Sequence, residues 1–141
     1  MIDIDEFVTN VCTVLHLNKP RVTYTDAGYA TKTTLAAISS DGAEIHVRPG
    51  MFSPDLFFAI AHELRHVWQK QYKPDILWGY RSSDRISTEE YNLQPAEIDA
   101  NAFATVIVVK TFRIKPLFQN QTERVKNRIY NRMSEISKTI D

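Results

Sequence analysis

The residues with the clearest chemical capacity are five consecutive ones, His62-Glu63-Leu64-Arg65-His66, which form the pattern HExxH. Because residues four apart lie on one face of a helix, His62 and His66 can present two imidazole nitrogens to a single ion. Zinc accepts such ligands at about 2.0–2.1 Å and is usually four-coordinate. Glu63 lies off this axis, where it can hold a metal-bound water and act as a general base. The pattern therefore predicts metal-assisted hydrolysis.

The surroundings of the motif predict one amphipathic helix over residues 54–72. Pro54 suits the first turn of a helix, and Ser53 before it can act as the N-cap. Pro74 disfavours helical geometry in Lys73, which ends the segment. The apolar stripe of this helix consists of Phe57, Ile60, Ala61, Leu64, Val67 and Trp68. Both histidines therefore lie in the middle of the helix, as a metal-binding pair in a metalloprotease requires.

The third metal ligand must come from another segment, because a catalytic zinc usually has three protein ligands and one open position. The chain has four histidines, and none of them follows His66. A later histidine ligand is therefore excluded, and with it the metzincin pattern. The candidates are carboxylates further along the chain: Asp75, Asp84, Glu89, Glu90, Glu97 and Asp99. We expect Glu89 and Glu90 to be solvated.

Glu97 is the carboxylate that the sequence favours. Pro95 opens a predicted helix that runs to about residues 110–111. Small residues recur on the Glu97 side of this helix: Ala96, Ala100 and Ala104. Such a stripe lets the helix approach the first one closely, so that a long carboxylate can reach the metal. Asp99 lies about 200° further around the helix and is expected to point away, whereas Asn101 faces the same way as Glu97 and can orient a ligand histidine.

These motifs resemble those of a known group of enzymes. An HExxH motif followed by a glutamate on a later helix resembles the gluzincin arrangement. More narrowly, the run Glu97-x-x-Ala100-Asn101-x-Phe103-Ala104 resembles the E-x-x-A-N-x-F-A signature of ImmA/IrrE-type metallopeptidases.

The resemblance covers about residues 43–109 and implies a set of roles. In that family a strand precedes the HExxH helix, as the segment 43–48 would here. The implied zinc ligands are His62, His66 and Glu97. Glu63 is implied to be catalytic. Two features depart from the family pattern: Arg65 stands where glycine is common, and the chain has no room for the helix-turn-helix DNA-binding domain that family members often carry.

Length and periodicity predict one α+β domain over residues 1–141, and the resemblance implies that this domain is zincin-like. The expected elements are helices over 3–17, 54–72, 95–111 and 122–138, strands over 21–25, 33–39 and 43–48, and a short helix or turn near 87–91. The strands are expected to form a small, mostly antiparallel sheet, with a hairpin turn at 40–42. The longest connection is 74–95.

The connection 74–95 carries side chains that can border the site. Tyr80, Arg81 and Tyr91 are candidates for stabilising the oxyanion that develops when an amide is hydrolysed. A tyrosine is favoured because no histidine follows the motif, and Tyr91, which lies just ahead of Glu97, is the preferred donor. The alternative is that all three are packing or surface residues.

Other conspicuous side chains have more ordinary interpretations. His46, on the third predicted strand, is expected to be structural or exposed, although the edge of that strand can pair with an extended substrate peptide. Trp68 and Trp78 are expected in the core. The basic residues near the C-terminus are expected to form a solvated helix face: Arg124, Lys126, Arg128 and Arg132.

Composition limits the class of protein. Seventeen basic and seventeen acidic side chains cancel, which argues against a general attraction to nucleic acids or membranes. The single cysteine, Cys12, excludes an internal disulfide and fits a reducing compartment. The first residues lack the pattern of a signal peptide, and no apolar run is long enough to span a bilayer. We therefore expect a cytoplasmic protein.

Taken together, these features predict a small zinc-dependent metallopeptidase that acts on a protein or peptide substrate, with Glu63 as the general base. By resemblance, the substrate would be a partner protein such as a transcriptional repressor. The competing hypothesis is a non-enzymatic regulatory or protein-interaction module that contains zinc. A fourth protein ligand would favour that alternative, since a structural zinc is fully coordinated by the protein.

Overall fold

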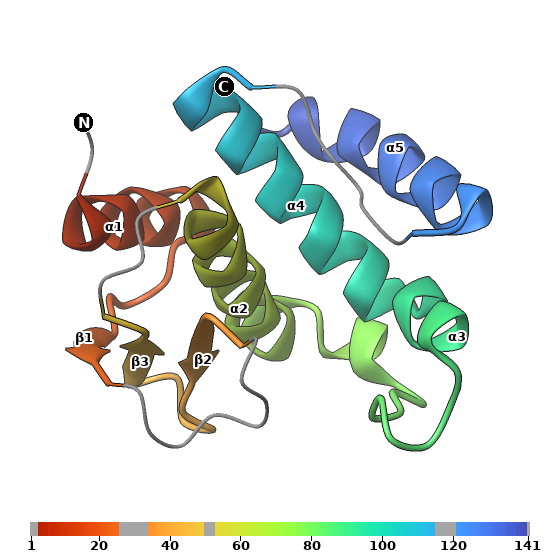
Figure 1. Ribbon diagram of the computed structural model, residues 1–141, viewed down its shortest axis with the longest axis horizontal. Coiled ribbons are helices and arrows are strands. Elements are labelled where there is room, and N and C mark those ends of the chain that lie inside the picture. The colour runs from red at the N-terminus through yellow and green to blue at the C-terminus, as the bar shows by residue number, and fades with distance from the viewer. Residues whose placement is uncertain (1–2, 26–33, 50–52, 115–120, 141) are drawn as a thin grey trace.

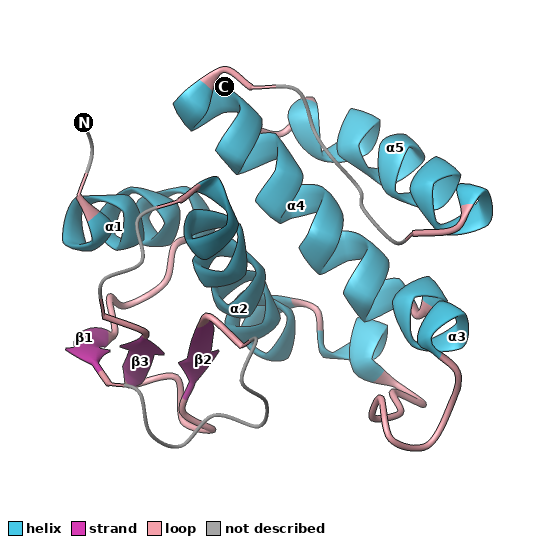
Figure 2. Cartoon of the chain, viewed as in Figure 1, coloured by secondary structure: helices cyan, strands magenta, loops and turns pink. Residues whose placement is uncertain are grey.

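The computed structural model describes residues 3–25, 34–49, 53–114 and 121–140. Helices make up most of this part of the chain, and the strands are short (Figures 1 and 2). In chain order the elements are α1 (Ile4–Leu15), β1 (Arg21–Tyr24), β2 (Ala36–Ile38), β3 (Glu44–Val47), α2 (Pro54–Tyr72), the 3-10 helix η1 (Pro74–Leu77), α3 (Thr88–Leu93), α4 (Pro95–Phe112) and α5 (Glu123–Ser137). The predicted α+β class is therefore confirmed.

The helix ends follow local chemistry. Asp3 caps α1, because its side chain accepts a hydrogen bond of 2.7 Å from the backbone amide three residues on. Thr122 caps α5 in the same way. Ser53 takes the N-cap position of α2 without a side-chain capping bond, and Pro54 occupies the first turn, where a missing amide proton costs little. The helix predicted over 54–72 has these bounds in the structure.

The three strands form a mixed sheet in the order β1-β3-β2. β2 and β3 are antiparallel and are joined by a tight turn, in which Gly42 adopts a φ of 72°. β1 runs parallel to β3, with Arg21 opposite Glu44. The prediction of a mostly antiparallel sheet is therefore wrong for the β1–β3 pairing. Alternating apolar residues identify strands, but they carry no information about the order or direction in which the strands pair.

The strand that carries His46 is the central one. β3 pairs with β1 on one side and with β2 on the other, so both of its edges are occupied. The prediction that the edge of this strand can pair with a substrate peptide is therefore wrong. β2 is the outer strand that packs against α2 (Figure 1).

α4 is the centre of the helical part of the fold. α2 packs on one side of it and α5 on the other (Figure 1), so that every residue from 96 to 108 is buried. α1 packs against α2, where the Phe57 ring lies 4.8 Å from that of Phe7 and 4.9 Å from that of Phe112, measured between centroids. Cys12 is buried in the same core, and burial raises the pKa of its thiol to about 11.

The two tryptophans differ in environment. Trp68 packs against the core, as predicted. Trp78 is 90% exposed, so the prediction that it lies in the core is wrong. It directly follows η1, which buries none of its residues. Within the described ranges, no helix combines the length and the apolar character needed to cross a membrane.

Candidate metal centre

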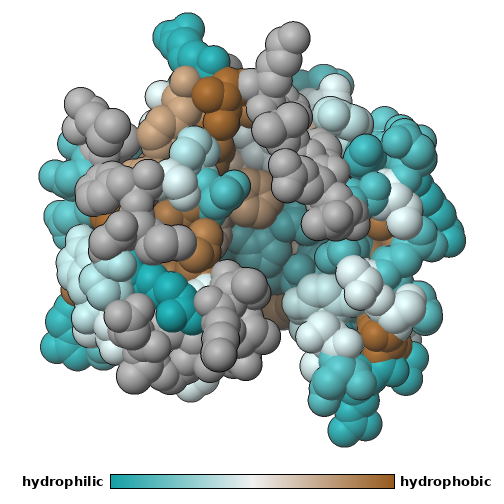
Figure 3. Space-filling model, viewed as in Figure 1, coloured by the Kyte–Doolittle hydropathy of each residue, from teal (hydrophilic) through white to brown (hydrophobic). Residues whose placement is uncertain are grey.

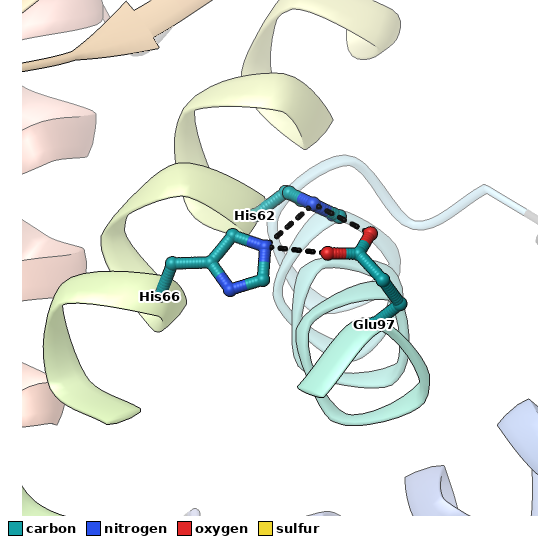
Figure 4. Close-up of side chains that lie close together, drawn as sticks. All are labelled: His62, His66 and Glu97. Atoms are coloured by element: carbon teal, nitrogen blue, oxygen red, sulfur yellow. Dashed lines mark hydrogen bonds and ion pairs between the residues drawn. The ribbon is translucent and has the colours of Figure 1, made fainter. Parts of the chain in front are cut away.

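Three side chains from two helices converge on one point (Figure 4). His62 and His66 extend from α2, one turn apart, and Glu97 extends from the first turn of α4. Their ligand atoms all lie within 4.8 Å of one another, so the group can hold a metal ion. The Glu97 side chain is 3% exposed, and those of His62 and His66 are 17% and 20% exposed. The structure thus brings together the three residues predicted as ligands.

The facing atoms are spaced as ligands of a single ion would be. His66 Nε2 lies 3.1 Å from His62 Nε2 and 3.0 Å from Oε2 of Glu97. His62 Nε2 lies 3.4 Å from Oε1 of the same carboxylate. Two ligands of a tetrahedral zinc at about 2.0–2.1 Å are about 3.3 Å apart. The spacing of these atoms is therefore close to what an ion of this size needs.

The outer nitrogen of each histidine ring is bonded to a side-chain amide. His62 Nδ1 lies 2.8 Å from Oδ1 of Asn101, and His66 Nδ1 lies 2.8 Å from Oε1 of Gln69. With the amide oxygens facing the rings, each Nδ1 is placed to donate a hydrogen bond, and each Nε2 faces the centre of the group. Asn101 thus contacts a histidine of the group from behind, as predicted. Two imidazole nitrogens and a carboxylate that converge in this way can hold a cation between them.

The electrostatics of the group favour positive charge at its centre. Burial acts to raise the pKa of Glu97, but the histidines outweigh burial and hold this pKa well below its usual range. Burial acts to lower the pKa of His66, but the hydrogen bond and charge of Glu97 outweigh it and raise the pKa. A proton and a metal ion therefore compete for the same position.

Glu63 belongs to the same electrostatic environment. Burial raises the pKa of this carboxyl group, the charges of His62 and His66 oppose the shift, and the charge of Glu97 adds to it. A raised pKa makes a carboxylate a stronger proton acceptor, which suits a general base.

Two tyrosines from the connection between α2 and α4 reach the group. The Tyr80 hydroxyl donates a hydrogen bond to Glu97 Oε2 at 2.7 Å and shares another, of 2.9 Å, with the Tyr91 hydroxyl. Burial raises the pKa of both tyrosines, so both remain protonated donors. Tyr80 therefore contacts a candidate ligand directly, although the sequence favours Tyr91 as the tyrosine at the site. Arg81 is anchored elsewhere, through its backbone, to the Gln94 side chain.

Asp99 points away from the three ligands, as predicted, and into a buried network. Arg65 donates to it through Nε at 2.7 Å and Nη2 at 2.9 Å, and Gln69 donates through Nε2 at 2.9 Å. Arg132 of α5 donates through Nε, also at 2.9 Å. Burial acts to raise the pKa of Asp99, but Arg65 and the other donors outweigh burial and lower the pKa. The prediction that Arg132 belongs to a solvated face is therefore wrong.

The other predicted candidates lie outside the group. This holds for the carboxylates Asp75, Asp84, Glu89 and Glu90. Glu89 pairs instead with Arg124 at 3.9 Å. His46 lies on the sheet, where its Nδ1 is 3.8 Å from Glu44 Oε1.

A cavity of about 270 Å³ opens beside His66. Its walls are the β2–β3 turn, residues 38–42, and the C-terminal half of α2, including Val67 and Lys70. On the face drawn in Figure 3, the molecule is hollowed between the part that carries the strands and the part that carries α3, over the region where α2 and α4 meet. The partial exposure of both histidines agrees with access from solvent.

Sequence reasoning missed the buried partners of these residues. Gln69 has a readable signal, because it follows His66 by three positions and therefore shares its helix face. Nothing in the sequence signals that Arg65 and Arg132 meet at Asp99, because that contact depends on how α5 packs.

No family model matches this chain, and comparison with curated proteins and with solved structures finds no match. The likeness of segment 97–104 to a peptidase signature therefore has no counterpart in these comparisons. The three converging side chains and their neighbours are what indicate a function for this protein.

Proposed function

We propose that the protein is a zinc-dependent metallopeptidase that acts on a protein or peptide substrate. The observation that carries the proposal is the convergence of His62, His66 and Glu97, with Glu63 next to the first of them in α2. Two imidazoles and one carboxylate form a donor set that zinc uses in catalytic sites. The zincin-like assignment of the fold, the resemblance to ImmA/IrrE-type metallopeptidases and a partner protein such as a repressor as substrate belong to the same proposal.

The residues of the chain have distinct roles in this reaction. When bound, zinc supplies Lewis acidity, which activates water and polarises a carbonyl group. Glu63 accepts a proton from the water as the water oxygen bonds to the carbonyl carbon. It then passes that proton to the amine nitrogen as the C–N bond breaks. Tyr91 is the candidate donor to the developing oxyanion, and Tyr80 holds Glu97 in place.

The alternative is a non-enzymatic module whose zinc is structural. Across the described ranges, no fourth Cys, His, Asp or Glu joins His62, His66 and Glu97. A structural zinc is closed by four protein ligands, whereas a catalytic zinc keeps a position for water or substrate. Three ligands, of which the two histidines are partly exposed to solvent, therefore favour hydrolysis.

Metal analysis and two variants test the proposal. Protein purified without chelators is expected to contain zinc, and its absence would overturn the proposal. Glu63→Gln should keep the metal and lower the rate of peptide-library cleavage by about 10²–10⁴-fold, because the general base is removed. His66→Ala should lose both metal and activity.

Glu89→Gln is the matched control, because Glu89 lies outside the group of ligands and should leave metal content and cleavage unchanged. Cleavage by Glu63→Gln at the wild-type rate, or no cleavage by the zinc-loaded wild type, would leave the non-enzymatic module as the better description.

A further inference from the structure

Gln69 is buried, and both the oxygen and the nitrogen of its side-chain amide form hydrogen bonds. It is 0% exposed and follows His66 by three positions on α2. Its Oε1 lies 2.8 Å from His66 Nδ1, and its Nε2 donates to the backbone oxygen of Ala96 and to Oδ2 of Asp99, both at 2.9 Å. One side chain thus links a candidate metal ligand on α2 to the backbone and to a carboxylate of α4.

The orientation of this amide follows from its partners. A backbone carbonyl and an ionised carboxylate can only accept hydrogen bonds, so the NH₂ group of Gln69 must face Ala96 and Asp99. The carbonyl oxygen is then left facing His66. An amide oxygen only accepts, so the His66 Nδ1 must carry the ring proton, and Nε2 is the nitrogen free to bind a metal.

The carboxylate behind Gln69 is itself fixed. Asp99 is 1% exposed, and Arg65 binds it through two hydrogen bonds, with Arg132 of α5 on the same Oδ1 as Arg65 Nη2. Two guanidinium groups keep Asp99 ionised and leave it little freedom to move. A chain of contacts therefore runs from α5 through Asp99 and Gln69 to the His66 ring.

We infer that Gln69, held by Asp99, is a positioning residue that fixes the His66 ring for metal binding through Nε2. The inference rests on the metal-binding part of the proposed function. Metal-ligating histidines commonly donate their second N–H to a carboxylate or carbonyl, and loss of that partner lowers metal affinity. Here the Gln69 amide lies between the Asp99 carboxylate and the His66 ring and is hydrogen-bonded to both. His62 is held separately, by Asn101 of α4.

A plain structural role for Gln69 makes a different prediction. If Gln69 only joins α2 to α4, its removal should lower the stability of the metal-free protein and leave the metal site unchanged. If it positions His66, its removal should also change the affinity and the geometry of the bound metal. The two roles are therefore separated by measurements on the metal, not by stability.

Gln69→Met is the direct test, because methionine has a similar length and offers no amide. We expect zinc affinity, measured by chelator competition, to fall by about 10- to 100-fold. The visible spectrum of the cobalt-substituted variant should also differ from that of the wild type, because the second histidine is no longer fixed. Gln71→Met, an exposed site on the same helix, is the matched control and should bind both metals as the wild type does.

Wild-type affinity and an unchanged cobalt spectrum in Gln69→Met would overturn the inference and leave the proposed function intact. Failure of the wild-type protein to bind zinc would overturn both. A measurement without any variant covers the case in which Gln69→Met does not fold. In zinc-loaded wild-type protein, NMR of the imidazole nitrogens should show His66 protonated at Nδ1, with slow exchange of that proton; coordination through Nδ1 would overturn the inference.

Discussion

The Tyr80 hydroxyl lies between a candidate metal ligand and a second tyrosine, and this placement separates the roles of the two phenols. Tyr80 donates to Glu97 at 2.7 Å, whereas Tyr91 contacts Tyr80 at 2.9 Å. We predict that Tyr80→Phe weakens zinc binding, because Glu97 loses the partner that orients it. Tyr91→Phe should keep zinc affinity and lower kcat by about 10²-fold, as expected for an oxyanion donor. Chelator competition and peptide cleavage measure the two effects.

Tyr24→Phe is the control for both variants, because Tyr24 lies on β1 and is 53% exposed. If Tyr80→Phe lowers kcat with full zinc affinity while Tyr91→Phe has no effect, the two roles must be exchanged.

Because Asp99 titrates at acid pH, the stability of the protein should depend on pH in that range. Its pKa is lowered, because Arg65 and the other donors outweigh burial. Relative to an unfolded value of about 3.9, the contribution of this group to the free energy of unfolding is complete above about pH 4 and is lost as the pH falls through the lower folded pKa. We predict that Asp99→Asn lowers the free energy of unfolding at pH 7 by about 3–5 kcal/mol, because Arg65 stays buried without its anion.

Urea unfolding at several pH values measures this effect, and the gap between variant and wild type should narrow below about pH 4. Arg21→Met is the control. Arg21 pairs with Glu44 at 3.0 Å, but its side chain is 78% exposed, so solvent and salt screen the pair. The prediction would be contradicted if Asp99→Asn lowered the free energy of unfolding no more than Arg21→Met does.

At the residue scale, what could be predicted from the sequence is what helix geometry determines. Helix geometry places His62 and His66 on one face of the first helix, and Glu97 and Asn101 on one face of the later one. The contact of Arg65 could not be predicted from helix geometry. Its partner Asp99 lies on α4, and only the packing of α2 against α4 reveals that this buried carboxylate receives it.

At the scale of elements, the fit between α2 and α4 sets the distance between the two halves of the site. Ala96, Ala100 and Ala104 are all 0% exposed and lie on the side of α4 that carries Glu97. We predict that Ala100→Leu costs about 1–3 kcal/mol of stability through overpacking and also weakens zinc binding, because it moves Glu97 away from the histidines. Thermal unfolding and chelator competition measure the two quantities.

Ala102→Leu is the matched control on the same helix. Ala102 is also 0% exposed, but it belongs to the hydrophobic core, so a larger side chain should lower stability with a smaller effect on zinc affinity. Equal losses of zinc affinity in both variants would show that the alanine stripe has no special part in the site.

The elements themselves were predictable to different degrees. Both long helices have proline at their first turn, and α2 also has an apolar stripe, so Pro54–Tyr72 and the start of Pro95–Phe112 could be predicted. The strands have three or four residues each, and their pairing depends on contacts distant in sequence, so the parallel β1–β3 pair could not. Trp78 was misplaced for a related reason, because composition does not indicate which side of a connection faces solvent.

At the scale of the whole molecule, metal binding and folding stability are linked, because the ligands come from two helices that must be packed together. We predict that zinc at a free concentration one hundred times its Kd stabilises the folded protein by about 2.7 kcal/mol, and that a chelator lowers Tm accordingly. Calorimetry with and without zinc measures this effect. His62→Ala should remove the dependence, and a Tm that responds to zinc in that variant would place the metal elsewhere.

The division of the site between α2 and α4 also has a kinetic consequence. Each helix can form early from local contacts, but His62 meets Glu97 only after the intervening segment, residues 73–94, has closed as a loop. We therefore expect the complete set of ligands to form late in refolding, when the two helices dock. The visible absorbance of cobalt bound at this site would report when the two helices dock. Circular dichroism, in contrast, would report the earlier formation of helix.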